Sequence, residues 1–341
     1  MNIDKEYIIS VAKDLLAVDS PTGFTDSIMS RLEELAAELG LKLEKSNKGA
    51  GIVRLPGKTE KLSGLCAHVD TLGLMVRSIT DKGTLAITAL GGGVFPTYDG
   101  EYCRIYTRDG RVFTGTVLSK SPAQHVFEDA NSRERDVSGM EVRIDEVVKS
   151  KEDVRRLGIS AGDFICLDPK TVITPSGFIK SRFLDDKLSA AILFAFMKYL
   201  RDNSVVPVND LVIMFSCHEE AGHGSAWLPE GISELLAVDM GCIGDDLSCT
   251  EYDVSICAKD RGGAYDYGMT TCLIRLAQLQ QINHAVDIYP FYMSDVSAAQ
   301  RAGHDVAGAL IGPGVSASHG MERSHIKAAE ATLRLLIAYF T

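Results

Sequence analysis

Residues 186–216 of the 341-residue chain read DKLSAAILFAFMKYLRDNSVVPVNDLVIMFS. Residues 186–200 are predicted to form a helix, and they contain the continuous apolar run Ala190–Met197. After a linker at 201–209, residues 210–216 form a short, mostly apolar run that is typical of a strand buried on both faces of a sheet. A helix that leads directly into a buried strand indicates an α/β fold.

The same alternation of helical and strand patterns occupies both ends of the chain, with strands predicted at 62–69, 235–239 and 306–311 and a closing helix at 326–339. Residues 77–173 instead contain short strand candidates, and Arg108-Asp109-Gly110 is a typical hairpin turn between two of them. We therefore predict an α/β fold with a mixed central sheet flanked by helices (residues 1–76 and 174–341), interrupted by an inserted small β-barrel-like domain (77–173).

Composition argues against several classes of partner. The chain has 35 basic and 46 acidic residues and a formal charge of −11, so it lacks the basic excess that nucleic acids or acidic membrane surfaces attract. Its apolar runs are much shorter than the ~18 residues of a membrane-spanning helix. Residues 1–10 do not resemble a secretory signal, and the eight cysteines include no C-x-x-C pair. We expect a cytoplasmic protein.

Acidic residues and histidines stand at the ends of the predicted strands, where open α/β sheets usually place their sites. Ala67-His68-Val69-Asp70 closes an apolar strand. Residues two apart in a strand face the same side, so His68 could bind a metal while Asp70 hydrogen-bonds its other ring nitrogen. The alternative is a purely structural His–Asp pair.

Two segments contain adjacent carboxylates. Asp185 and Asp186 begin a predicted helix, where one acidic residue would suffice as a cap and the second could bridge two cations. Glu219 and Glu220 follow the buried strand at 210–216, where desolvation makes carboxylates costly unless they have partners. One of the two could bind a metal while the other acts as a general base.

A rival interpretation applies to the glutamate segment. His218-Glu219-x-x-Gly222-His223 matches the H-E-x-x-G-H zinc motif of dipeptidyl-peptidase-III-like enzymes. That motif needs a continuous helix to bring both histidines to one face, whereas here a strand runs directly into it and Gly222 weakens a helix.

Asp239 follows another apolar strand, and His319 lies in the segment Ala317-Ser318-His319-Gly320. Each is weak evidence alone, because a single aspartate is usually a turn residue and a single histidine usually lies at the surface. Together with the other segments, however, they complete a set of imidazole and carboxylate ligands suited to two metal ions.

The order H-x-D, D-D-K, E-E-x-G, V-D and a late histidine resembles the dinuclear metalloaminopeptidases of the glutamyl-aminopeptidase and TET type (metallopeptidase family 42, clan MH). That group carries a β-barrel-like domain between the first and second ligands. The resemblance extends from about Leu16 to Tyr339. It includes three further landmarks, Pro21–Phe24, Gly91–Gly93 and Ser294–Ala298.

The resemblance implies specific roles. One divalent cation, zinc or cobalt, would be held by His68, Asp185 and Asp239. The second would be held by Asp185, Glu220 and His319. Glu219 would be the general base and Asp70 would orient His68. The implied reaction is hydrolysis of N-terminal residues from short peptides, by a homo-oligomer between a dimer and a dodecamer that uses the inserted domain for dimerisation or assembly.

Two departures from the family pattern concern the substrate. The usual stretch E-E-x-G-x-R-G-A contains an arginine that Glu219–Ala226 lacks, and glycine rather than serine follows His319. The preferred N-terminal residue therefore cannot be inferred, and neither can the roles of His223 and His325. Two alternatives stay open, namely a clan-related deacylase or amidohydrolase acting on another small amide, and a metal-retaining scaffold without useful catalysis.

Overall fold

The computed structural model describes residues 3–341; residues 1–2, which the sequence analysis assigned to the catalytic part, lie outside it. The chain divides into two compact units. The larger comprises the residues up to Thr71 together with Lys170–Thr341, and the smaller comprises Leu72–Pro169. Within residues 3–341, no helix combines the length and the apolar character needed to span a bilayer.

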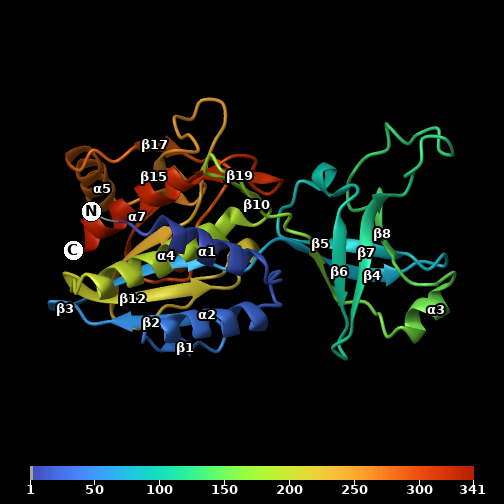
Figure 1. Cartoon of the computed structure of the whole chain (residues 1–341), viewed down its shortest axis with the longest axis horizontal. Coiled ribbons are helices and arrows are strands. Elements are labelled where there is room, and N and C mark those ends of the chain that lie inside the picture. Colours follow the sequence, from blue (N-terminus) through green and yellow to red (C-terminus); the bar gives the residue numbers. More distant parts are fainter. Residues whose placement is uncertain (1–2) are drawn as a thin grey trace. The chain divides into compact units, whose positions relative to one another are not determined.

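The larger unit is built on a mixed sheet, as the sequence predicted, and within residues 3–341 this sheet has ten strands (Figure 1). In spatial order its main path is β1 (Leu43–Lys45), β2 (Gly51–Leu55), β12 (Asn209–Ser216), β3 (Thr59–His68), β13 (Ile232–Val238), β18 (Ala307–Val315), β15 (Val254–Asp260) and β16 (Gly263–Ala264). Two further strands pair off this path, β14 (Gly241–Cys242) with β18 and β17 (His284–Ile288) with β15. The four central strands β12, β3, β13 and β18 run parallel.

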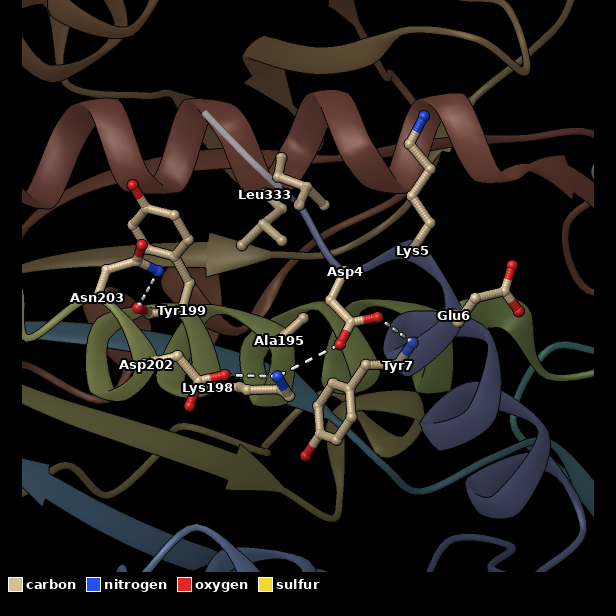
Figure 2. A pocket seen from close by; sticks show the side chains of 11 residues that line it. Asp4, Lys5, Glu6, Tyr7, Ala195, Lys198, Tyr199, Asp202, Asn203 and Leu333 are labelled. Carbon is tan, nitrogen blue, oxygen red and sulfur yellow. Dashed lines mark hydrogen bonds and ion pairs between the residues drawn. The ribbon is translucent and has the colours of Figure 1, made fainter.

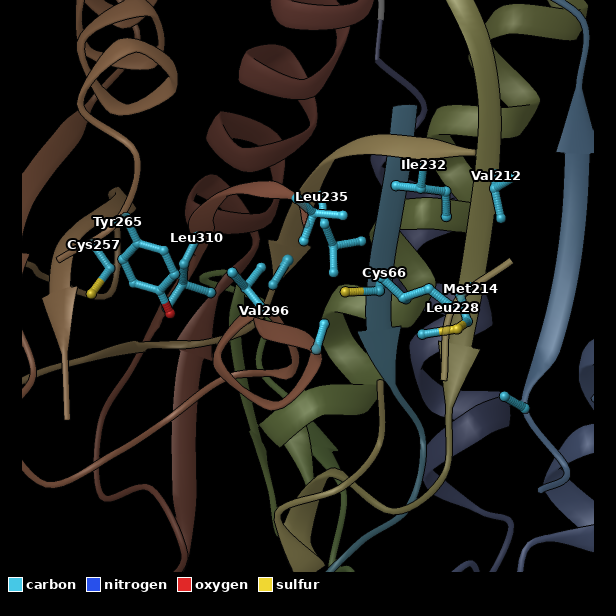
Figure 3. Close-up of a cluster of buried hydrophobic side chains, with 14 of the residues drawn as sticks. Cys66, Val212, Met214, Leu228, Ile232, Leu235, Cys257, Tyr265, Val296 and Leu310 are labelled. Carbon is cyan, nitrogen blue, oxygen red and sulfur yellow. The ribbon is translucent and has the colours of Figure 1, made fainter. Parts of the chain in front are cut away.

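Strand β12 shows why this sheet is covered on both faces. Phe215 stacks on Phe194 of helix α4 (Leu184–Asp202), with ring centroids 5.0 Å apart. Val212 and Met214 have the opposite parity in the strand and join a buried cluster on the other face. Figure 3 shows that cluster, in which Val296 of helix α6 (Asp295–Arg301) lies near strands β13 and β18.

The other helices of this unit are α1 (Lys5–Leu16), α2 (Asp26–Glu38), α5 (Tyr267–Leu279) and α7 (Ile326–Phe340). Helices α1 and α7 pack against α4, α5 packs against α7, and α2 packs against β1 and β2. A second sheet contains β10 (Val172–Ile173), β11 (Phe178–Ser181) and β19 (Glu322–His325), of which the sequence analysis anticipated none.

The smaller unit is a closed six-stranded barrel. Its strands in spatial order are β4 (Gly73–Ile79), β5 (Leu85–Leu90), β8 (Met140–Ile144), β7 (Val112–Ser119), β6 (Tyr102–Tyr106) and β9 (Phe164–Leu167). The Arg108-Asp109-Gly110 turn joins β6 to β7, and Gly110 has the positive φ of 84° that such a turn requires. The short helices η1 (Phe95–Tyr98) and α3 (Lys151–Arg156) lie between strands of the barrel in sequence.

The parallel strands bring the acidic segments together. His68 at the end of β3 pairs in register with Ser216 at the end of β12. One strand further along the sheet, Val238 at the end of β13 pairs with Ile311 of β18. The carboxyl ends of β3, β12 and β13 therefore meet at one edge of the sheet, and the segments that follow them converge there.

Candidate metal centre

Asp185 lies between two histidines that are far from each other in the sequence. Its Oδ1 is 3.0 Å from Nε2 of His68, and its Oδ2 is 3.4 Å from Nε2 of His319. The same His319 nitrogen lies 3.6 Å from Oε2 of Glu220. A carboxylate whose two oxygens face two different imidazoles has the arrangement of a bridging ligand between two cations.

Two groups of potential ligand atoms within 4.8 Å of one another are found among residues 3–341. One contains His68, Asp185 and Glu220, and the other contains His68, Asp186 and Asp239. The five ligands named from the sequence therefore lie in one cluster, with His319 joined to it through Asp185 and Glu220. Asp186 belongs to this cluster as well, and the sequence analysis gave it no separate role.

Two buried carboxylate oxygens of the cluster have no hydrogen-bond partner, namely Oδ1 of Asp186 and Oε1 of Glu220. The other oxygen of Asp186 accepts the main-chain N–H of His68 at 3.1 Å. Leaving buried acceptors unpaired is costly, and a bound cation would satisfy them. The residues present therefore fit a divalent metal site.

The pKa values of the carboxyl groups in the cluster also indicate a divalent metal site. Burial raises the pKa of Glu220 to about 7, assisted by the charge of Asp185. Burial also raises the pKa values of Glu219 and Asp239. For Asp185, hydrogen bonds from His319 and His68 outweigh the effect of burial and lower the pKa. Carboxylates packed this closely hold protons unless positive charge compensates them, and divalent cations would replace those protons.

The start of α4 has an unusual backbone that presents Asp185 to the cluster. Asp185 and Asp186 have non-helical φ and ψ angles, and the peptide bond between them is cis. The N–H of Asp185 donates to Oε2 of Glu322 at 3.1 Å, while Oε1 of Glu322 accepts the N–H of His319 at 3.0 Å. The buried Glu322 therefore joins the backbones of two candidate ligands, a role that no sequence pattern indicated.

Asp70 contacts His68 through a different atom from the one expected. Nδ1 of His68 lies 2.9 Å from the main-chain carbonyl oxygen of Asp70 and 3.6 Å from its carboxylate. The carboxylate instead accepts the N–H groups of Glu219 (3.1 Å) and Glu220 (3.3 Å) and the hydroxyl of Thr22 (2.6 Å). The expected contact of Asp70 with the second ring nitrogen of His68 is thus made by the main-chain carbonyl, because the start of a helical turn offers the carboxylate unpaired N–H donors.

Glu219 and Glu220 lie on a single 3₁₀ turn, η2 (Glu219–Ala221), between Ser216 and a left-handed Gly222. Oε2 of Glu219 lies 3.9 Å from Nε2 of His68. No continuous helix follows β12, so the helical H-E-x-x-G-H motif is not formed. The rings of His218 and His223 stack on each other with centroids 4.9 Å apart.

The roles of His223 and His325 were left open by the sequence. Nδ1 of His223 is 3.1 Å from Nζ of Lys48, outside the ligand cluster. His325 precedes α7, where its Nδ1 accepts the N–H of Lys327 at 3.1 Å and its Nε2 lies 2.8 Å from the carbonyl of Ser176. His325 therefore joins the start of α7 to the turn before β11.

A cavity of about 550 Å³ lies elsewhere in the larger unit, beside the start of α1 and the end of α4 (Figure 2). Lys198 there contacts Asp4 at 3.3 Å and Asp202 at 2.5 Å. These charged groups satisfy one another, and none of the residues lining the cavity belongs to the ligand cluster.

Comparison with known proteins places these observations in a family. Residues 49–335 match the profile of the M42 glutamyl aminopeptidases. A Bacillus subtilis (strain 168) protein named "Putative aminopeptidase YhfE" is 42% identical over 333 residues, which cover 97% of this chain and 96% of that protein.

Two solved structures share the fold. The TET aminopeptidase of the marine sediment archaeon Thaumarchaeota archaeon SCGC AB-539-E09 superposes with a TM-score of 0.87 at 18% identity, over 97% of this chain and 96% of that one. The TET1 peptidase of Pyrococcus horikoshii gives 0.82 at 21% identity, over 97% and 98%. The profile match covers most of the chain, and the chain therefore belongs to the M42 glutamyl aminopeptidase family.

Proposed function

We propose that this protein is a metal-dependent aminopeptidase that removes N-terminal residues from short peptides with the help of two divalent cations. The observation that carries the proposal is the position of Asp185, whose two carboxylate oxygens face His68 and His319. Membership of the M42 family supports the same reaction.

In this proposal His68, Asp185 and Asp239 would hold one cation, and Asp185, Glu220 and His319 would hold the other. When bound, the cations would supply Lewis acidity toward the peptide carbonyl and the attacking water. Glu219 takes the proton of that water and passes it to the leaving amine. Asp70 holds the turn that carries both glutamates by accepting their main-chain N–H groups.

The remaining assignments are also proposals. A set of imidazole and carboxylate ligands suits zinc or cobalt. The eight cysteines, all within the described residues, are free thiols, which supports a cytoplasmic location. We assign dimerisation or assembly to the barrel unit, within a homo-oligomer. This is supported by the likeness to TET1 of Pyrococcus horikoshii, which can assemble into a tetrahedron or a large octahedral shell.

The two alternatives are less well supported. A deacylase acting on another small amide could use the same cluster, but the family match favours a peptide substrate. A scaffold would need no carboxylate beside the ligands, whereas Glu219 lies 3.9 Å from His68.

The test is hydrolysis of a panel of aminoacyl-chromophore substrates by protein reconstituted with zinc or cobalt, with N-acetylated compounds as controls. We expect cleavage only of the substrates with a free amine. The Glu219→Gln variant should bind the same amount of metal and lose about 10²–10⁴-fold in kcat, the range typical of general-base catalysis. Cleavage of the acylated compounds alone would replace this proposal with the deacylase.

A further inference from the structure

One carboxylate holds both ends of the loop that carries Glu219 and Glu220. The hydroxyl of Ser216, the last residue of β12, donates to Oδ2 of Asp295. At the other end of the loop, the N–H of Ser225 donates to Oδ1 of Asp295 at 2.7 Å. Asp295 is only 3% exposed, so water does not compete for these contacts.

The loop approaches this carboxylate so closely that no side chain fits between them. A Cβ atom on Gly224 would lie 2.2 Å from Oδ1 of Asp295 and 2.9 Å from the hydroxyl of Ser216. Gly224 and Gly222 also leave this part of the loop intrinsically flexible, because glycine has many accessible backbone conformations. An anchor at both ends therefore restricts a segment that would otherwise vary in position.

Asp295 is itself firmly placed at the start of α6. The buried Asp260 accepts the N–H of Ser294 at 3.2 Å and the hydroxyl of Ser297 at 2.7 Å, which fixes the residues on both sides. The next residue, Val296, is fully buried in the apolar cluster beneath β13 and β18 (Figure 3). Asp295 thereby connects the rigid core of the unit to the glutamate loop.

We propose that Asp295 is a positioning residue that holds Glu219 and Glu220 in the position and orientation that the reaction needs. The proposal rests on the function assigned above. Asp70 accepts the two glutamate N–H groups, and Asp295 binds the residues at the two ends of their loop. Small displacements of reacting groups reduce rates strongly, so losing this anchor should lower kcat more than it weakens substrate binding.

The main test compares the full-length, metal-reconstituted protein with its Asp295→Ala and Asp295→Asn variants on free-amine aminoacyl substrates. We expect Asp295→Ala to lower kcat about 10²-fold with KM changed less than about threefold. Asp295→Asn should recover most of kcat, because its amide oxygen can still accept the N–H of Ser225 and its amide nitrogen can donate to Ser216. A kcat for Asp295→Ala within twofold of wild type, with metal bound, would overturn the proposal.

A second pair of variants tests the same contacts of Asp295 even if Asp295→Ala does not fold well. Gly224→Ala should lower kcat because its methyl group displaces the Asp295 carboxylate, and Ser216→Ala should lower it less, since it removes only one contact. In the Asp295→Ala background, Gly224→Ala should add little, because the carboxylate at 2.2 Å is gone and the hydroxyl of Ser216, at 2.9 Å, can rotate away. Ser30→Ala, which removes an exposed hydroxyl bonded within α2, serves as the matched control.

The outcomes separate this inference from the proposed function. An inactive wild-type protein with metal bound would contradict the aminopeptidase. An active wild type whose Gly224→Ala and Ser216→Ala variants both keep full kcat would overturn only the role of Asp295. Fully additive effects of Gly224→Ala and Asp295→Ala on kcat would also overturn the role of Asp295, because they would show that the two residues do not act through one contact.

Discussion

Removing the metals should make the stability of this protein depend strongly on pH. In the metal-free cluster, the pKa of Glu220 is about 7, against 4.5 for the exposed carboxyl of an unfolded chain. The folded state thus holds this proton more tightly than the unfolded state. The stability that Glu220 contributes is therefore greatest below pH 4.5 and falls as pH rises toward 7. The difference of 2.5 pKa units (7 − 4.5) corresponds to roughly 3 kcal/mol.

The pKa shifts of neighbouring groups also lower the stability of the metal-free protein as pH rises. Burial raises the pKa of Glu322 to about 8, which extends the loss of stability to higher pH. The pKa of His68 is raised because its bond to Asp185 outweighs the effect of burial, so its stabilising proton is also lost as pH rises. The lowered pKa of Asp185 has the opposite effect, and it acts below pH 3.8.

The assay is urea unfolding followed by circular dichroism between pH 5 and pH 8, with chelator or with added zinc or cobalt. We expect the metal-free protein to lose roughly 3 kcal/mol or more over this range, and metal to restore it increasingly as pH rises. The Glu220→Gln variant should show a pH dependence smaller by roughly 3 kcal/mol. Metal-free stability that stays constant or rises from pH 5 to pH 7.5 would refute the reasoning.

Three further predictions concern individual residues. Glu322→Gln should weaken metal binding about 10- to 100-fold in a chelator competition titration, because Glu322 holds the backbones of the candidate ligands Asp185 and His319. Unchanged metal affinity would contradict this role. Gly312→Ala would place a Cβ 1.6 Å from the carbonyl oxygen of Asp239. We expect reduced metal content by elemental analysis, and full occupancy in a folded variant would count against that packing. Phe215→Ala removes the stack on Phe194 and should cost about 3–5 kcal/mol in urea unfolding, whereas a loss below about 1 kcal/mol would be inconsistent with the buried contact.

Strong apolar patterns made the central fold predictable, whereas short strands that pair across a long separation in the sequence were missed. The run at 210–216 predicted a buried strand, and β12 covers Asn209–Ser216. Strands β11 and β19, with the sequences FIKS and ERSH, are short and largely polar. They form because they pair with each other, from Phe178↔His325 to Ser181↔Glu322, and a pairing across such a separation leaves no periodic trace in either segment.

The candidate site was predictable at the level of residue types and less so at the level of contacts. Histidines and carboxylates at the ends of apolar strands identify the cluster, because parallel strands end at one edge of a sheet. The H-x-D spacing does not determine which atoms of Asp70 meet His68, since the side chain of Asp70 can turn toward other donors. Glu322 joins nearby His319 to distant Asp185, and Asp295 binds Ser216 and Ser225, both of which are distant in the sequence. Asp295 lies within the landmark Ser294–Ala298, but the local sequence does not indicate these partners.

The means by which this fold holds its carboxylates suits a cation site. Asp70 accepts the N–H groups of the glutamate turn, Asp186 that of His68, and Glu322 those of Asp185 and His319. A main-chain N–H orients a carboxylate without cancelling its charge, because the amide is neutral. Lysine or arginine in the same places would neutralise the cluster and compete with a metal. Anchoring by amides therefore fixes the geometry and leaves the negative charge available to bind divalent cations.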